Sequence, residues 1–520
     1  MTTLDERSRR SIVAVAVSGQ QHGSVFLDAG GRVLRPAKLW CDTETAREAE
    51  ELSKKMGETV VPAFTAPKVA WLAANEPGVA ERVSCVCLPH DFVNMVLCGE
   101  TRPVSEAGDA SGTGYWNVEK REFDLGKAAL VDVRLPSWLP ALAPSPDAAV
   151  GAVCAAAAEL TGLPAGIPVA PGSGDNACAA LGVGAVVPGE FESLKKIFSS
   201  RFAFKSFLFS LSLSLSLSFS SLSLSNASLS SSPPPHNQIQ SLQGDWVVSL
   251  GTSGTLFGPS GSPPPPSPSG AVARFCDATG QWMPLLCTLN CTVPAEQVRR
   301  AWGLTHDAAA GLAELAAARG GGGAGPLTFL PYLAGERTPN WPWAKGCVLG
   351  LDPSTLSSPD AAAGALYLAA LEGATFSLLA GLRAMQSDSG PPPRSIILVG
   401  GGARSQLWTK IVADSFGLPV SRPSEPEAAA LGAALQAAAV AEGSKVGDYV
   451  SATAGEVERA GASSSGSGAD APSSSSSSSS VTEPDLSKRE SYDDAFARHQ
   501  NLGEALFGEE GGVAKRMFLG

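Results

Sequence analysis

Short apolar runs alternate along the chain with segments whose apolar residues recur at helical spacing. The runs at 12–17, 246–250 and 395–399 are rich in β-branched residues and predict buried strands. The Ala/Leu-rich stretches 360–386 and 427–439 predict two long helices. Strand and helix patterns that alternate in this way indicate an α/β protein.

The remaining elements follow from the same patterns. We expect a hairpin-like pair of short strands after residue 23, a strand–turn–helix unit at 85–99 and a polar, Gly-rich loop at 106–115. Further helices are predicted at these ranges: 43–56, 64–71, 294–302, 406–417 and 491–507.

The stretch Pro171–Gly184 combines a small-residue turn with an acid and an amide, Asp175 and Asn176. The pattern is typical of a strand, a tight turn and the start of a closely packed helix. An acid in this position can take a proton from a substrate hydroxyl or help to hold a metal ion. It can also simply be the N-cap of the helix, and local spacing alone favours that reading.

Three polar side chains, Gln20, Gln21 and His22, follow the apolar run 12–17. Ligands of open α/β sheets bind at the carboxyl ends of strands, so this position suits a polyhydroxylated ligand. A polar turn that satisfies its own backbone explains the same residues equally well.

Two glycine-containing loops follow later strands. Gly251-Thr252-Ser253 comes after the run 246–250 and presents N–H groups and hydroxyls that suit a phosphate, although β-hairpins use the same residues. The triplet Gly400–Gly402 lies between a predicted strand and a predicted helix, as in many nucleotide sites. A tight strand-to-helix connection without a ligand is the alternative for the triplet.

The composition changes abruptly at residues 190–244. Residues 206–225 read SFLFSLSLSLSLSFSSLSLS, which is too rich in serine for a membrane-spanning helix. We interpret 190–244 as a low-complexity, disordered insertion, and a translated intron is one origin that fits its abrupt borders. A second Ser-rich segment at 461–484 reads as a linker.

Composition limits the classes of partner. The chain has 38 basic and 50 acidic residues and a net charge of −12, which argues against nucleic-acid or membrane-surface binding. Its ten cysteines show no paired metal-type spacing and are expected to be reduced thiols of an intracellular protein. The short apolar run after the basic N-terminal residues predicts a buried strand rather than a signal peptide.

Seven motifs taken together resemble the FGGY carbohydrate kinases, in particular members that act on xylulose. In chain order they are SGQQHGSV, LWCDTET, FTAPK, SGDNA, VVSLGTSGTLF, LPYLAGERTPN and VGGGARSQLW. The resemblance implies two actin-like (ribonuclease H-like) ATPase domains around a cleft. We expect a sugar-binding domain at 1–189, an ATP-binding domain at 245–460, and a C-terminal helix and tail at 485–520.

The resemblance also implies roles for individual residues. Asp175 resembles the catalytic base and a Mg²⁺ ligand. Gln21, His22, Asp175 and Asn176 resemble the sugar-binding set. The residues that resemble the ATP-binding loops are Gly251, Thr252, Ser253, Gly401, Gly402, Ala403 and Ser405. The implied reaction is ATP- and Mg²⁺-dependent phosphorylation of D-xylulose in the cytoplasm, with a plastid location left open and a homodimer allowed.

Two departures from the family pattern matter. No D-x-G-T hairpin precedes Ser18, so the first domain is expected to lack its opening strands and to leave a sheet edge exposed. The insertion at 190–244 separates the two domains. A kinase for ribulose or glycerol, a non-catalytic sugar- or nucleotide-binding relic, and a misassembled gene model therefore stay open as alternatives.

Overall fold

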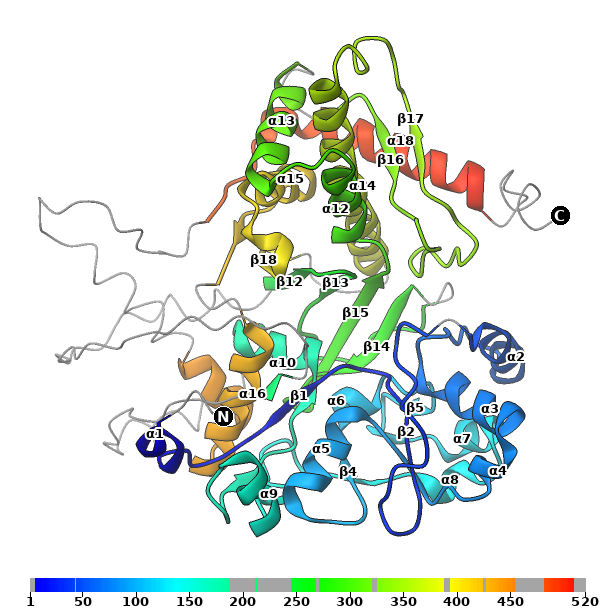
Figure 1. Cartoon of the computed structure of the whole chain (residues 1–520), viewed down its shortest axis with the longest axis vertical. Coiled ribbons are helices and arrows are strands. Elements are labelled where there is room, and N and C mark those ends of the chain that lie inside the picture. The colour runs from blue at the N-terminus through cyan, green and yellow to red at the C-terminus, as the bar shows by residue number, and fades with distance from the viewer. Residues whose placement is uncertain are drawn as a thin grey trace, which may run out of the picture.

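The structure is a computed structural model, and Figure 1 shows that it has two lobes with a sheet at the centre of each. It describes residues 5–42, 44–186, 211–212, 245–267, 271–319, 325–387, 393–423, 427–453 and 481–508. The lower lobe in Figure 1 contains the elements up to α10 (Asp175–Gly182) together with α16 (Ala428–Glu442). The upper lobe contains the remaining elements from β12 (Asp245–Leu250) onward.

The upper lobe is built on a six-stranded mixed sheet. Its strand order is β14-β15-β13-β12-β18-β19. The strands are β12, β13 (Gly254–Phe257), β14 (Val272–Cys276), β15 (Trp282–Thr288), β18 (Ser395–Val399) and β19 (Val420–Ser421). β12 pairs in parallel with β18, which pairs in parallel with β19, whereas β12, β13, β15 and β14 pair antiparallel. The predicted strands at 246–250 and 395–399 are therefore neighbours in one sheet.

Helices cover this sheet because its strands are apolar on both faces. The helices of the upper lobe are α12 (Thr292–Ala301), α13 (His306–Arg319), α14 (Pro359–Ser387), α15 (Gln406–Phe416) and α18 (Arg489–Phe507). α14 packs on the sheet through a core that includes Val248, Leu286 and Leu378. Among the described residues α14 is long and apolar enough to cross a membrane, yet most of it is buried in this core.

The lower lobe has a smaller parallel sheet around β1 (Val17–Gly19). β1 lies between β10 (Ser173–Gly174) and β11 (Leu211–Ser212), and all three strands are parallel. The prediction of a strand over 12–17 was wrong in its bounds. Residues before Val17 are extended and make only a single bridge, between Val15 and Val169, because no longer strand lies beside them in the described part of the chain.

Short elements complete the lower lobe. Its other strands are β2 (Val25–Leu27), β3 (Cys85–Cys87), β4 (Val104–Ser105), β5 (Trp116–Asn117), β6 (Glu122–Phe123), β7 (Ala141–Leu142), β8 (Gly151–Ala152) and β9 (Pro168–Val169). Its helices are α1 (Glu6–Arg10), α2 (Ala46–Met56), α3 (Thr65–Asn75), α4 (Pro77–Ala80), α5 (Pro89–Cys98), α6 (Ala107–Ala110), α7 (Leu125–Val131), α8 (Leu135–Trp138) and α9 (Ala155–Thr161). The stretch 106–115, predicted as a loop, contains the single helical turn α6, which the side chain of Glu106 caps.

A close helix crossing lies within the lower lobe, where α10, which begins at Asp175, packs on α16. α10 packs against α16, and both helices have a glycine where they meet. A Cβ on Gly182 would lie 1.9 Å from the carbonyl oxygen of Ala428, and one on Gly432 would lie 1.7 Å from that of Cys178. Only glycine lets the two backbones approach this closely.

The two low-complexity predictions lie mostly outside the described residues. Within 190–244 the structure describes only β11, which pairs in parallel with β1. Within 461–484 it describes residues 481–484, where Thr482 exchanges two backbone hydrogen bonds with Val420 of β19. The end of the predicted linker therefore lies against the upper sheet.

Candidate active site

Asp175 lies where strand β10 passes directly into helix α10. Gly174 occupies the N-cap position and makes no side-chain cap bond, so Asp175 is the first residue of the helix. The alternative that Asp175 is the N-cap is therefore wrong. Its Oδ1 accepts hydrogen bonds from the backbone N of Asn176 at 2.9 Å and from Asn176 Nδ2 at 3.1 Å. A carboxylate in the first turn is also stabilised by the helix dipole.

The side chain of Asp175 is solvent-exposed, although protein atoms surround its carboxylate. Desolvation raises the pKa of Asp175 to about 6, and the backbone hydrogen bond from Asn176 opposes this shift. A carboxylate in a low-dielectric environment binds a proton more readily because its charged form loses hydration. Asp175 therefore remains ionised at neutral pH and is a stronger base than an ordinary aspartate.

Asn176 connects Asp175 with both lobes. Its Nδ2 donates to Gln21 Oε1 at 3.2 Å, and its Oδ1 accepts from Thr255 Oγ1 at 2.9 Å. Gln21 follows β1 in the lower lobe, whereas Thr255 belongs to β13 in the upper lobe. This hydrogen-bond chain brings together two of the residues that the sequence predicted, Gln21 and Asn176. It also adds Thr255, which the sequence analysis missed.

The side chain of Gln21 leaves one donor unused. Gln21 is 4 % exposed and packs against Gly174, where a Cβ would lie 2.5 Å from its Cγ. Its Nε2 is buried and has no hydrogen-bond partner within the described part of the chain. Buried donors are nearly always satisfied in folded proteins, so this atom is suited to a ligand oxygen.

His22 is held in place by its backbone and by aromatic rings. Its φ of +65° is in the left-handed region, which non-glycine residues rarely adopt outside turns and functional sites. Its ring lies 5.3 Å from that of Phe64 and 5.7 Å from that of Phe275, and Nδ1 is 2.8 Å from the carbonyl oxygen of Gly112. Desolvation, with the nearby charges of Arg337 and Lys68, lowers the pKa of His22 well below its usual range. A neutral ring whose Nδ1–H donates to Gly112 leaves Nε2 as an acceptor for a hydroxyl.

The two predicted phosphate-type loops meet at the end of β12. Gly251-Thr252-Ser253 joins β12 to β13, and Thr252 is exposed. Gly400 has a φ of +86°, and a Cβ there would lie 2.9 Å from the carbonyl oxygen of Leu250. Gly402 packs on the side chain of the same Leu250. The structure thus places these loops side by side at the carboxyl ends of the parallel strands β12 and β18.

The residues after Gly400 form a 3-10 turn rather than a simple loop. This turn spans Gly401–Arg404, and space around Gly401 is open, since a Cβ there would touch nothing within 4 Å. Ala403 is buried, and Ser405 caps helix α15 by accepting a hydrogen bond from Trp408 N at 3.2 Å. Ser405 therefore has a structural role at the N-terminus of α15, where backbone N–H groups favour anions.

A buried polar network contacts β10 through Ser173, and no sequence pattern predicted it. Glu106 accepts from Ser173 Oγ at 2.8 Å and from the backbone N of Gly108 at 2.6 Å. His90 Nδ1 lies 2.6 Å from Asp109 Oδ2. Desolvation raises the pKa of Asp109 well above its usual range, and the charge of Asp175 adds to this shift. The network fixes the strand that ends at Asp175.

The residues of this site can hold a metal ion only if a bound substrate supplies further ligands. In the part of the chain that the structure describes, no three His, Cys, Asp or Glu side chains are grouped to hold a metal. Asp175 is exposed, and its neighbour Asn176 is hydrogen-bonded to Thr255 of the hairpin that carries the loop Gly251–Ser253. Mg²⁺ is commonly bound by one or two carboxylates together with water and substrate phosphates, which fits this arrangement.

Similar proteins identify the family. Residues 1–182 match the N-terminal domain of the FGGY family of carbohydrate kinases, and residues 246–441 match its C-terminal domain. A protein named xylulose kinase from Streptomyces coelicolor is 35% identical over 449 residues, which cover 84% of this chain and 76% of that protein. One of the same name from Haemophilus influenzae is 32% identical over 442 residues, covering 82% and 75% of the two chains.

Solved structures agree with this assignment. A structure described as a xyloylose kinase from Brucella ovis matches with a TM-score of 0.71 and 30% identity, over 95% of this chain and 85% of that one. A glycerol kinase from Plasmodium falciparum has the same fold at 15% identity and a TM-score of 0.67, over 93% and 82% of the two chains. The chain belongs to the FGGY family of carbohydrate kinases, which are phosphotransferases that act on an alcohol group.

Proposed function

We propose that this kinase transfers the γ-phosphoryl group of ATP to D-xylulose and forms D-xylulose 5-phosphate. The observation that carries the proposal is the hydrogen-bond chain from Gln21 through Asn176 to Thr255, with the exposed Asp175 beside it. These hydrogen bonds link Gln21, in the motif predicted to bind the sugar, to Thr255, in the hairpin predicted to bind phosphate. The names of the relatives favour xylulose over other sugars.

In this reaction Asp175 orients the terminal hydroxyl of the sugar and takes its proton as the oxygen attacks the γ-phosphorus. Gln21 Nε2 and His22 Nε2 offer one donor and one acceptor to the sugar. The loop Gly251–Ser253 holds phosphate oxygens, and the turn from Gly401 holds the adenosine side of ATP. Such positioning of the reactants supplies most of the catalysis in phosphoryl transfer.

Mg²⁺ is proposed as the metal cofactor, held by Asp175 and by the phosphates of ATP. When bound, it neutralises charge on the phosphate oxygens. The chain itself contributes the base, the sugar contacts and the two loops.

A panel of sugars tests the substrate. The full chain is incubated with ATP, Mg²⁺ and D-xylulose, ribulose, glycerol or gluconate, and ADP formation is followed with a coupled assay. We expect the highest kcat/KM for D-xylulose. A higher kcat/KM for another sugar would reject xylulose as the substrate while leaving the kinase assignment intact.

The pH dependence of this activity follows from the raised pKa of Asp175. The reaction needs the deprotonated carboxylate, so kcat/KM should be constant above neutral pH and should fall as the pH decreases through about 6. His22 stays neutral across this range because its pKa is lowered, so it adds no acidic limb of its own. The measurement is kcat/KM for the sugar between pH 4.5 and 8. An acidic limb centred near the usual aspartate value of about 4 would contradict the desolvation of Asp175.

A further inference from the structure

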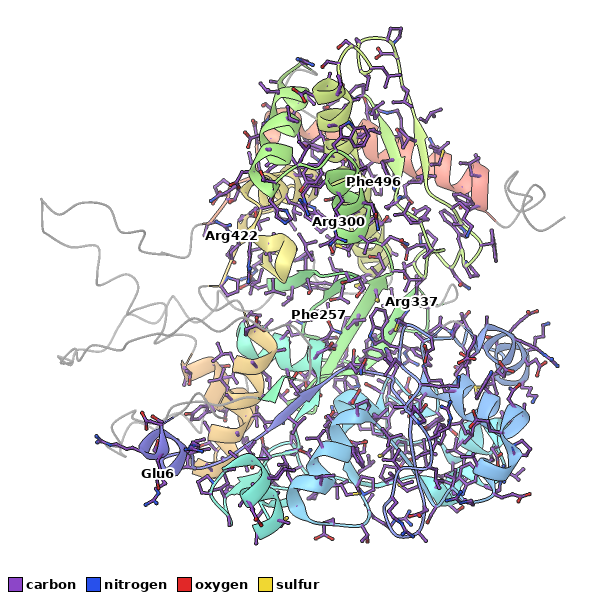
Figure 2. All side chains as sticks on the ribbon, in the orientation of Figure 1. Glu6, Phe257, Arg300, Arg337, Arg422 and Phe496 are labelled. Carbon is purple, nitrogen blue, oxygen red and sulfur yellow. The ribbon has the colours of Figure 1, made fainter. Side chains whose placement is uncertain are left out.

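Arg337 projects from the upper lobe toward the sugar side of the lower lobe. It lies in the segment between β16 (Thr328–Leu330) and β17 (Cys347–Leu349). Figure 2 places it where the two lobes meet. Its guanidinium carbon lies 5.8 Å from the ring centre of Phe64, the residue that also packs against His22. The side chain therefore reaches, from the opposite lobe, a residue that packs against His22 of the predicted sugar-binding set.

The backbone that carries Arg337 is fixed by the neighbouring acid. Glu336 is 1 % exposed, and it accepts hydrogen bonds from Leu289 N at 2.6 Å, Asn290 Nδ2 at 3.0 Å and Arg337 N at 2.7 Å. The carboxylate thus anchors the segment to the end of β15. Glu336 binds the backbone N of Arg337, so the backbone is fixed while the guanidinium is not engaged by this carboxylate.

Within the described ranges the guanidinium of Arg337 has no carboxylate partner. None of the ion pairs found in the described ranges involves Arg337. Lys68, the other cation near His22, is buried and donates to the carbonyl oxygens of Ala63 and Phe64. Of these two cations near His22, Arg337 is the one that makes no ion pair among the described residues and can contact a ligand.

Sheet pairing places Arg337 close to the acid–amide pair as well. Burial raises the pKa of the Cys287 thiol, and Arg337 lies near enough for its charge to oppose this rise. Cys287 is the register partner of Thr255 in the β13–β15 pair. Thr255 in turn donates to Asn176. Arg337 is thus connected with Asn176 through Cys287 and Thr255, and it also lies near Phe64 and His22.

From this placement we infer that Arg337 is a substrate-binding residue that the upper lobe contributes to the sugar site. The guanidinium carries a rigid fork of N–H donors, which can contact two adjacent oxygens of a ketose. Gln21, His22 and Asn176 approach the sugar from the lower lobe, so the contact from Arg337 would make sugar binding depend on the position of the upper lobe. The inference rests on the proposed function, because it concerns the sugar that this site phosphorylates.

The test measures the KM for the sugar and the KM for ATP separately in the variant Arg337→Gln. Loss of a charged hydrogen-bond donor should raise the sugar KM by about 10- to 100-fold. The ATP KM should stay within about twofold of the wild-type value, since the lost contact is not to the nucleotide. Arg337→Lys, which keeps the charge but not the fork, should recover part of the loss. Calorimetric titration of the full chain with the sugar should show the same loss of affinity without ATP.

The matched control is Arg300→Gln. Arg300 is an upper-lobe arginine on α12, it is exposed, and it pairs with Glu296 at 2.7 Å. Its replacement should change neither KM. Thermal unfolding of each variant shows whether the protein is still folded.

An unchanged sugar KM and sugar affinity in Arg337→Gln would overturn the inference, as would a rise confined to the ATP KM. If the wild-type chain prefers another sugar, the proposed substrate fails, and the Arg337 variants are measured on the preferred sugar. If no sugar is turned over, the affinity for D-xylulose decides the question, and an absence of binding by the wild-type chain overturns the inference too.

Discussion

Replacing Asp175 by Asn is expected to lower kcat for sugar phosphorylation by about 10²- to 10⁴-fold. Asparagine keeps the size of the side chain and can still accept the hydrogen bond from the backbone N of Asn176. It cannot take the proton of the sugar hydroxyl. Because Gln21 and Asn176 remain in place, the affinity for the sugar should change little. The measurements are kcat from ADP formation and the sugar Kd from calorimetry.

The control for this variant is Asp360→Asn. Asp360 is also an exposed acid in the first turn of a helix, α14 of the upper lobe, and it belongs to none of the predicted sugar- or ATP-binding motifs. Its replacement should leave kcat unchanged. Undiminished phosphorylation by Asp175→Asn would refute the role of Asp175 as the base.

Among the substitutions proposed here, Gly432→Ala is expected to reduce the free energy of unfolding most. The added Cβ would lie 1.7 Å from the carbonyl oxygen of Cys178 and 2.7 Å from the backbone N of Gly182. Backbone atoms on both sides cannot move independently, so α10 and α16 must separate. Overpacking of this kind costs about 1–3 kcal/mol of the free energy of unfolding, and this contact is closer than most. Because α10 begins at Asp175, activity should fall as well.

A second helical glycine provides the comparison. Gly311 lies within α13, and a Cβ there would touch nothing within 4 Å. Gly311→Ala should be neutral or should stabilise the protein by up to about 1 kcal/mol through helix propensity. The measurement is denaturant unfolding of both variants beside the wild type. Equal stability of Gly432→Ala and Gly311→Ala would show that the helix crossing is looser than the structure indicates.

The elements that local patterns could predict are those with strong periodicity. The runs 246–250 and 395–399 are strands β12 and β18, and the Ala-rich stretches are helices α14 and α16. The bounds of the first strand were wrong, because its pairing depends on partners distant in sequence rather than on its apolar content. Glu106 shows the same limit, since its cap turns part of a Gly-rich stretch into a helical turn.

The sequence predicted those site residues that lie in local motifs and missed those that only the packing of the lobes brings to the site. Gln21, Asp175 and Asn176 belong to motifs with polar residues at strand ends, and the structure brings them together. Thr255 and Arg337 were missed as site residues. A threonine in GTSGT is typical of any hairpin, and a charged residue in a Pro/Trp-rich segment has no local mark of function. Their position beside Asn176 and His22 follows from the packing of two lobes, which no single stretch of sequence encodes.

The most direct test of the central claim is product formation by the full chain itself. The protein is mixed with ATP, Mg²⁺ and D-xylulose, and the sugar phosphate is followed by phosphorus nuclear magnetic resonance, with Asp175→Asn in a parallel sample. We expect a new phosphomonoester signal for the wild-type chain, formed together with ADP, and a much slower one for the variant. Calorimetric binding of D-xylulose with no phosphomonoester formed by the wild-type chain would contradict the central claim.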